Sequence, residues 1–259
     1  QTGREMLLQR ILKTSRSSNF ISLLKKSFRT IYQKLLIKWK KPYLDSIILG
    51  GERLLANEAV YISSQTQVIN AHVQDYDTFC EIKNTRETYS EGKYLVFLDQ
   101  NITEHPDLKF LNVRRESPEV SFQRLRGLSA QLEQQGYEVI IALHPRDTGS
   151  STEKFGNRKT FKGISPELAV SSSGVITHCS NALNFAVLTR KPILFVADRE
   201  IMDMFFQISV LCEWFDSLPL MLDTVVKQED IINAMQVDEP VYQRYQENFI
   251  QTNEDAFAS

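Results

Sequence analysis

The sequence predicts an α/β protein whose parallel sheet is covered by helices on both faces. Beyond residue 93, short runs that are apolar throughout alternate with helical stretches, which is the pattern of strands buried on both sides. Two of these helices open with Ser-Pro, a common start signal in which serine caps and proline takes the first position. With 259 residues, 42% of them apolar, the chain is long enough for one large domain or two of about 100–150 residues.

Four elements are expected in the N-terminal part of the chain. Residues 5–41 have apolar side chains at three- and four-residue spacing and a basic opposite face, which indicates an amphipathic helix. Residues 45–51 and 67–72 are typical of short strands, and residues 75–82 of a helix.

A polar stretch without apolar periodicity, residues 83–93, predicts a linker. We therefore expect an N-terminal domain at 1–90 and a C-terminal domain at 91–259. Because the chain begins with Gln1 instead of Met, we expect the first domain to be incomplete.

The C-terminal elements are expected in a regular alternation. Between residues 117 and 136, Ser117 caps a helix, Pro118 takes its first position and Gly136 ends it. The polar residues 151–160 are predicted to be a solvated loop. The complete order is strand 94–100, helix 117–136, strand 137–144, helix 165–173, strand 174–178, helix 180–190, strand 191–197, helix 200–215, strand 218–223, and helices 227–236 and 240–251.

Charge is divided unevenly along the chain. Residues 1–41 contain eleven Lys or Arg and one acid, a net charge of +10, whereas the remaining residues hold 19 bases and 31 acids, a net −12. Residues 10–41 therefore either pack on the N-terminal domain with their charges in water or dock on an anionic membrane surface. Because the rest of the chain is acidic and no nucleic-acid motif is present, we expect no nucleic-acid partner.

Two further features bear on the compartment. No apolar run approaches the roughly 20 residues that a membrane-spanning helix needs. The three widely spaced cysteines form neither a disulfide framework nor a metal site, and they suit a reducing cytoplasm: Cys80, Cys179 and Cys212.

Polar side chains follow three of the predicted strands. In an open parallel sheet, ligands bind outside the carboxyl ends of the strands, so these side chains should share one rim. His144 and Arg146 would offer a proton donor and a cation to a ligand, and Ser180 would add a hydroxyl and free backbone N–H groups for phosphate oxygens. The candidate residues are Asp99, Gln100, His144, Arg146, His178, Ser180 and Asn181.

The order of two motifs on successive strand ends resembles a known group of enzymes. "LHPR" places His144 before a proline, and "THCSNALNFAVLTRKPILF" places Ser180 at a helix start one βαβ unit later. This resembles bacterial GT-B glycosyltransferases that use CMP-activated sugars: sialyltransferases, polysialyltransferases and Kdo transferases. "FLDQ" and "AHVQDYD" resemble further stretches of such proteins.

The resemblance implies a GT-B-like fold of two Rossmann-type domains, with the acceptor on the N-terminal side and the C-terminal sheet the better defined. It implies a nucleotide-sugar donor, CMP-linked by preference, and a glycan or lipid-linked glycan acceptor of capsule or lipopolysaccharide synthesis. No metal and no other cofactor is implied. The protein would work in the cytoplasm, or peripherally on the inner membrane face.

The resemblance also assigns roles to single residues, and each has a plain structural alternative. His144 would contact the donor phosphate and protonate the departing CMP, and Ser180 would hold the same phosphate. Asp99 would be nucleophile or base, assisted by Asp75 or Asp77, or it is a turn acid. The structural alternative for Ser180 is that it only caps a helix. The alternative for His178 is that it belongs to the edge of the hydrophobic core.

Two other functions remain open. A UDP-N-acetylglucosamine 2-epimerase also uses a His-Pro strand end, although "SNALNFAV" lacks the Ser-Gly-Gly of those enzymes. The absence of an acidic-acidic-glycine motif favours a non-catalytic scaffold module of glycan assembly.

Overall fold

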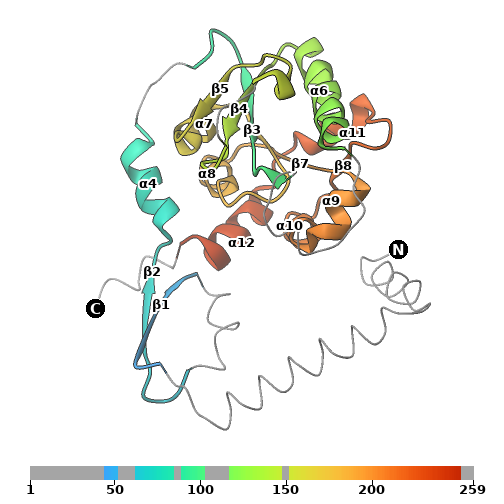
Figure 1. Cartoon of the computed structure of the whole chain (residues 1–259). Helices are drawn as coiled ribbons and strands as arrows, with labels where there is room; N and C mark the ends of the chain where they lie inside the picture. Colours follow the sequence, from blue (N-terminus) through green and yellow to red (C-terminus); the bar gives the residue numbers. More distant parts are fainter. Residues whose placement is uncertain (1–43, 52–61, 85–88, 103–116, 148–151, 252–259) are drawn as a thin grey trace, which may run out of the picture.

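The computed structural model of the protein describes residues 44–51, 62–84, 89–102, 117–147 and 152–251 (Figure 1). Its main sheet has six parallel strands in the order β5-β4-β3-β6-β7-β8. Their bounds are β3 (Tyr94–Leu98), β4 (Glu138–Leu143), β5 (Thr160–Lys162), β6 (Val175–Thr177), β7 (Ile193–Ala197) and β8 (Leu220–Met221).

This strand order is that of a doubly wound α/β sheet. The chain steps outward from β3 through β4 to β5, then returns to the other side of β3 and steps through β6 and β7 to β8. The direction therefore reverses between β3 and β6, where Val96 pairs with Val175. The predicted α/β class, with the C-terminal parallel sheet the better defined, is confirmed.

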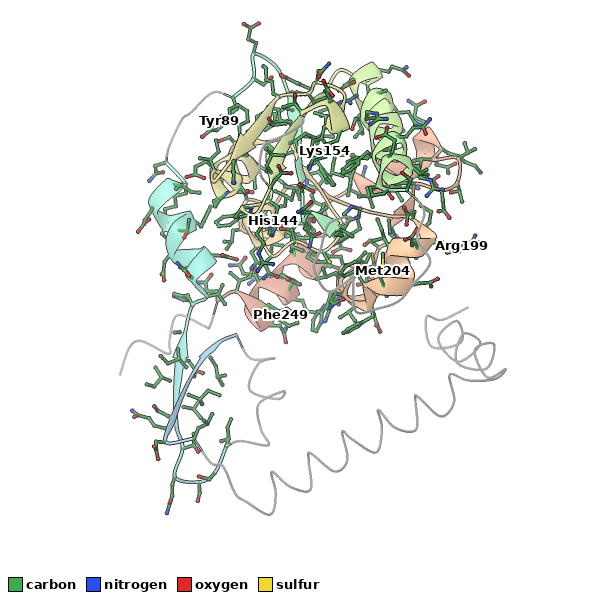
Figure 2. All side chains as sticks on the ribbon, viewed as in Figure 1. Tyr89, His144, Lys154, Arg199, Met204 and Phe249 are labelled. Carbon is green, nitrogen blue, oxygen red and sulfur yellow. The ribbon has the colours of Figure 1, made fainter. Side chains whose placement is uncertain are left out.

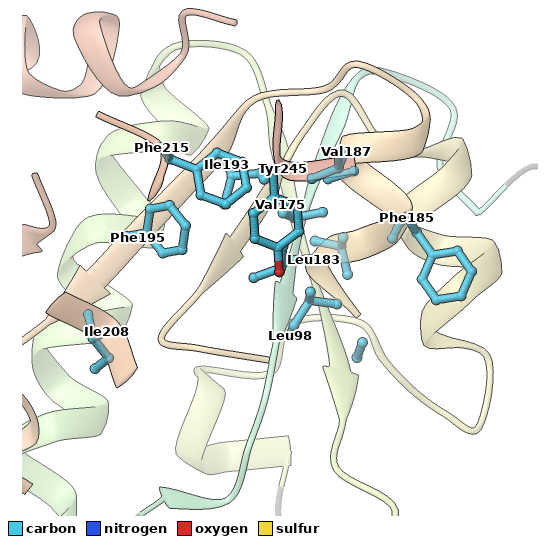
Figure 3. Close-up of a cluster of buried hydrophobic side chains, with 14 of the residues drawn as sticks. Leu98, Val175, Leu183, Phe185, Val187, Ile193, Phe195, Ile208, Phe215 and Tyr245 are labelled. Carbon is cyan, nitrogen blue, oxygen red and sulfur yellow. The ribbon is translucent and has the colours of Figure 1, made fainter. Parts of the chain in front are cut away.

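Helices cover both faces of this sheet. The alternation of side chains along β3 divides the core, because Val96 and Leu98 join one buried cluster and Leu95 and Phe97 join the other. Figure 3 shows part of the first cluster, whose members include Val175 of β6 and Tyr245 of α12. The helices are α6 (Pro118–Gln134), α7 (Ser165–Ser171), α8 (Leu183–Leu188), α9 (Arg199–Met204), α10 (Phe206–Trp214), α11 (Gln228–Ala234) and α12 (Glu239–Phe249).

Helix α6 forms as its sequence predicts. Ser117 accepts a hydrogen bond from the Glu119 N–H at 3.3 Å, and Pro118 begins the helix. Gly136 follows with a φ of 89°, a left-handed conformation that glycine adopts without strain.

Two of the predicted segments differ in the structure. The expected helix 200–215 is divided, because Phe205 has a ψ of 83° and separates α9 from α10. The expected loop 151–160 contains the 3₁₀ turn η3 (Thr152–Phe155) and leads into β5, which pairs with β4 through Thr160 and Ile141. This strand was missed because an edge strand of three residues has no apolar run to announce it.

The N-terminal part forms a separate pair of parallel strands, β1 (Ser46–Gly50) and β2 (Gln67–Ala71), followed by α4 (Gln74–Ile82). Helix α4 lies against α7 and α8 (Figure 1), and Asp75 Oδ2 accepts a hydrogen bond from Asn184 Nδ2 at 2.7 Å. Val73 N–H donates to the Ile250 carbonyl at 3.0 Å, directly after α12.

The expected amphipathic helix over residues 5–41 lies outside the described residues. Within the part of the chain that the structure describes, no helix has the length and apolar character to cross a bilayer.

Candidate functional site

The carboxyl ends of β3 and β6 lie side by side at the point where the strand order reverses, which is where open α/β sheets bind ligands. Gln100, after β3, spans this point. Its Oε1 accepts the Cys179 N–H at 2.7 Å, and its Nε2 lies 3.5 Å from Cys179 Sγ. Both ends of the Gln100 amide therefore contact Cys179, so the residue links two strand ends and does not project toward a donor.

A tight turn follows β4 and fixes the tautomer of His144. The Asp147 N–H donates to the His144 carbonyl at 2.8 Å, and the Arg146 N–H donates to His144 Nδ1 at 3.1 Å. Since Nδ1 accepts, the neutral ring carries its proton on Nε2. His144 is partly exposed (Figure 2) and Arg146 is exposed, so both can meet a ligand at this rim.

Two basic side chains of the segment after this turn are engaged inside the protein. Lys154 forms an ion pair with Asp147, which is only 4% exposed, and the Lys154 ammonium lies 5.2 Å from the centre of the Phe155 ring. Arg158 binds both carboxylate oxygens of Glu133, at 2.6 and 2.9 Å. The expectation of a solvated loop holds in part: most described residues of 152–160 are exposed, whereas Phe155 is buried and Lys154 is held by the buried Asp147.

The Asp99 carboxylate has one oxygen bonded to the main chain and the other in a buried space. Its N–H donates to the Ala142 carbonyl at 3.0 Å, and its Oδ1 accepts the Asn101 N–H at 3.0 Å. Its Oδ2 is buried and meets no hydrogen-bond partner among the described residues. Burial raises the pKa of Asp99, and the Asn101 N–H and the charge of Lys154 oppose that rise.

His178 is part of the protein interior. The ring is 8% exposed, Nδ1 lies 2.6 Å from the Val196 carbonyl, and the edge of the ring meets Phe97 with centroids 5.7 Å apart. Because a carbonyl can only accept, Nδ1 carries the proton and Nε2 is the acceptor. Burial lowers the pKa of His178, although Asp198 and Asp99 oppose the fall. This buried position does not offer the expected contact between His178 and a nucleotide-sugar donor.

One buried acid of this edge was not among the predicted site residues. Asp198, after β7, is 2% exposed and caps α9 through the Ile201 N–H at 2.8 Å. Its other oxygen accepts from Ser121 at 3.2 Å and from Arg124 at 3.4 Å, which ties α6 to β7. An aspartate directly between an apolar run and a helix is a cap signal that the sequence does contain.

A small cavity of about 30 Å³ lies under the rim, lined by Asp99, Ser121, His178, Asp198 and surrounding apolar side chains. Ligand pockets commonly measure about 300–1,000 Å³, so this cavity is too small for a nucleotide. A nucleotide bound at this edge would therefore lie across the outer rim.

The turn at Ser180 corrects one expectation. The α-helix begins at Leu183, not at Ser180, and has six residues. The Ser180 N–H donates to Thr177 Oγ1 at 3.0 Å, and Ser180 Oγ accepts the Ala182 N–H at 3.3 Å. Because these N–H groups are already bonded, a ligand would meet the Ser180 hydroxyl and the exposed Asn181 side chain.

His144 and Ser180 lie on the same edge of the sheet. They follow β4 and β6, which flank β3. Neighbouring strands are about 4.8 Å apart, so the two strand ends are roughly 10 Å apart. This span fits a phosphate group held between them.

A larger cavity lies elsewhere in the protein. It has a volume of about 900 Å³ and is formed by the start of β8 and the segments around α11 and the start of α12. Its lining includes the acids Asp216, Asp230, Asp238 and Glu239, a charge unsuited to phosphate. Within the described ranges, no cluster of three His, Cys, Asp or Glu side chains has a metal-binding arrangement.

Comparisons with known proteins give a likeness of fold. No family model and no curated protein matches the sequence. A solved structure of a glycotransferase of kitacinnamycin shares 7% identity and a TM-score of 0.43, over 77% of this chain and 49% of that chain. The glycosyltransferase SnogD from Streptomyces nogalater shares 11% identity and a TM-score of 0.39, over 71% and 45%. The chain thus spans about half the length of these structures.

Proposed function

We propose that this chain is the donor-binding part of a glycosyltransferase. It would move a sugar from a nucleotide-sugar donor, CMP-linked by preference, to a surface glycan such as capsule or lipopolysaccharide. One observation carries the proposal: His144, Arg146 and Ser180 flank the point where the strand order reverses, at the carboxyl edge of the sheet.

The connection after β3 favours a nucleotide sugar over a dinucleotide. Dinucleotide-binding sheets of this order place glycines there, so that the pyrophosphate reaches the N-terminus of the next helix. Residues 99–116 contain no glycine, and the start of α6 is occupied by its own Ser117 and by Pro118. Phosphate binding is therefore assigned to the turns after β4 and β6.

The proposed chemistry is displacement at the anomeric carbon of the donor sugar. The acceptor oxygen bonds to that carbon as the bond to the donor phosphate breaks and its electron pair leaves with the phosphate. His144 Nε2–H, the Arg146 guanidinium and the Ser180 hydroxyl would stabilise the charge on the leaving phosphate. As base, Asp99 would take the proton of the acceptor hydroxyl in that step. As nucleophile, Asp99 would first bond to the anomeric carbon as the phosphate leaves, and the acceptor oxygen would then displace it and give its proton to the released carboxylate. No metal or other cofactor is assigned a part.

The acceptor and the location follow from the charge of residues 10–41. A basic amphipathic segment would hold the enzyme at an anionic inner membrane face, where a lipid-linked glycan acceptor would be found. The protein is accordingly assigned to the cytoplasm, in part on the membrane surface.

Titration with CMP, CDP and UDP by calorimetry tests the donor site. We expect micromolar binding of CMP, weakened at least about tenfold by His144→Ala and by Arg146→Ala, because each removes a charge-assisted contact worth about 1.5–3 kcal/mol. Lys93→Ala removes an exposed cation at the opposite end of β3 and is the matched control.

Two results would overturn the proposal. Absence of binding to all three nucleotides would favour a scaffold module. Preference for UDP, with release of an epimerised free sugar in the absence of acceptor, would favour the epimerase.

A further inference from the structure

We propose that a water molecule in the small cavity bridges Asp99 Oδ2 and His178 Nε2, and that His178 is a positioning residue that shares the proton of Asp99. The bridge itself is a structural inference. Its catalytic consequence rests on the proposed function.

The size and lining of the cavity favour bound water. A volume of about 30 Å³ exceeds the roughly 10–15 Å³ that one water molecule requires, and it is far too small for an organic ligand. A buried water also needs two to four polar partners, and an apolar cavity of this size would remain dry. Asp99 and His178 both line the space, together with Ser121 and Asp198.

The hydrogen bonds leave one acceptor atom on each of the two side chains. Asp99 Oδ1 accepts the Asn101 N–H, whereas Oδ2 is buried without a partner among the described residues. His178 donates through Nδ1 to the Val196 carbonyl, which leaves the Nε2 lone pair as the acceptor of the ring. A water has two protons, one for each of these acceptors.

The other acid of the cavity needs no water. Asp198 Oδ1 accepts the Ile201 N–H, and Oδ2 accepts from Ser121 and Arg124. Asp198 therefore contributes negative charge to the cavity while its oxygens are bonded to protein.

Charged groups from four elements surround the bridged pair. Lys154 on η3 and Asp147 on the turn after β4 face Asp99, Asp198 after β7 faces His178, and Arg124 on α6 neutralises part of the Asp198 charge. Burial raises the pKa of Asp99 and lowers the pKa of His178. The proton affinities of the two groups therefore move toward one another, which is the condition for sharing a proton.

The shared proton has a defined route. When Asp99 takes a proton from an acceptor hydroxyl, it becomes a neutral carboxylic acid. Asp99 then gives a proton to the water as the water gives one of its own to His178 Nε2. The result is an Asp99 carboxylate, a neutral water and a His178 imidazolium, with no change in the number of protons.

The bridge is tested by NMR titration of the His178 ring, without nucleotide, in the full chain and in Asp99→Asn. Removing the carboxylate should lower the pKa of His178 by at least about half a unit, because a nearby anion favours the imidazolium. Asp216→Asn removes a carboxylate that pairs with Arg244 far from the cavity and serves as control. An unchanged His178 titration in Asp99→Asn would refute the bridge.

The positioning role is tested by the pH profile of sugar transfer in His178→Gln. We expect the limb of the kcat profile that reports Asp99 to shift while the KM for the donor stays within about twofold. An unshifted profile would overturn the positioning role. The His178 titration could respond to Asp99→Asn although the protein transfers no sugar to any acceptor. That result would support the bridge and overturn the proposed function.

Discussion

At the scale of single residues, two histidines that follow strands in the same sheet have opposite environments. His144 Nδ1 accepts the Arg146 N–H, so the ring directs its proton toward the rim. His178 donates from Nδ1 to the Val196 carbonyl and is buried against Phe97. The difference arises from the neighbouring strand, because β7 lies beside β6 and places the Val196 carbonyl next to the His178 ring.

Asp99 predicts a pH dependence of stability. Its folded pKa is raised by burial, so the native state holds this proton more tightly than the unfolded chain does. The contribution of Asp99 to stability is thus greatest at low pH and falls as pH rises through the folded pKa. Asp99→Asn should therefore be more stable than the parent chain at pH 7.5, with a difference that shrinks on acidification.

Urea denaturation at several values between pH 7.5 and pH 4 measures that difference, because the unfolded carboxyl titrates near its ordinary value of 3.8. Asp216→Asn, which removes an exposed carboxylate at the far side of the sheet, is the comparison. A difference between Asp99→Asn and the parent chain that is constant over this range would contradict the assignment of buried charge to Asp99.

At the scale of elements, helix boundaries were predicted where local signals decide them. Ser117, Pro118 and Gly136 bound α6 in the sequence and in the structure. The break at Phe205 and the strand β5 were not predicted, because they depend on packing against neighbours and not on the local pattern.

Arg190 joins two elements far apart in the sequence. It ends α8 with a φ of 53° and binds three side chains of α12, namely Glu239 at 2.5 Å and Gln243 and Gln246 at 2.8 Å. Arg190→Ala should lower the free energy of unfolding by about 1–2 kcal/mol, since these bonds are partly exposed. Arg190→Gly loses the same bonds but adopts the left-handed backbone freely, so it should lose less.

Urea denaturation measures both Arg190 variants, and hydrogen exchange reports whether α12 is the element released. Lys159→Ala, which removes an exposed pair with Glu138 away from α8 and α12, should cost less than about 1 kcal/mol. Equal losses for Arg190→Ala and Lys159→Ala would count against the role of Arg190 in holding α12.

At the scale of the whole molecule, Gly51 controls the approach of the N-terminal strand pair to α12. Its φ is 102°, and an added Cβ would lie 2.4 Å from the Asn248 carbonyl oxygen. Gly51→Ala should therefore cost about 2–3 kcal/mol, the left-handed strain plus a clash with backbone that cannot rotate away. Gly136→Ala, with a φ of 89° but open space around it, should cost only the strain, about 1 kcal/mol.

The two glycine variants are compared by urea denaturation, with limited proteolysis to detect separation of the strand pair. If both variants lost the same stability and the same proteolytic resistance, the contact between β1 and α12 would not contribute to the stability of the protein.

The uneven charge of the chain predicts membrane binding that depends on salt. The full protein should co-sediment with vesicles rich in anionic lipid, and 0.5 M salt should release it. Replacing Lys25, Lys26 and Arg29 by Glu should weaken binding at least about tenfold, since each cation near the surface contributes about 1 kcal/mol. Lys93→Glu is the control, and equal binding to zwitterionic vesicles would disprove an electrostatic mode.

The sequence by itself determined the parallel α/β class, the bounds of α6 and the placement of polar side chains after three strands, because apolar runs and caps are local properties. Tertiary structure alone decided the surroundings of those side chains. Strand order buried His178 and turned Asp99 Oδ2 inward, engaged Gln100 with Cys179, and left His144 at the rim. The physical reason is that burial and hydrogen-bond partners come from neighbouring strands, whose residues lie as many as 79 positions away along the chain.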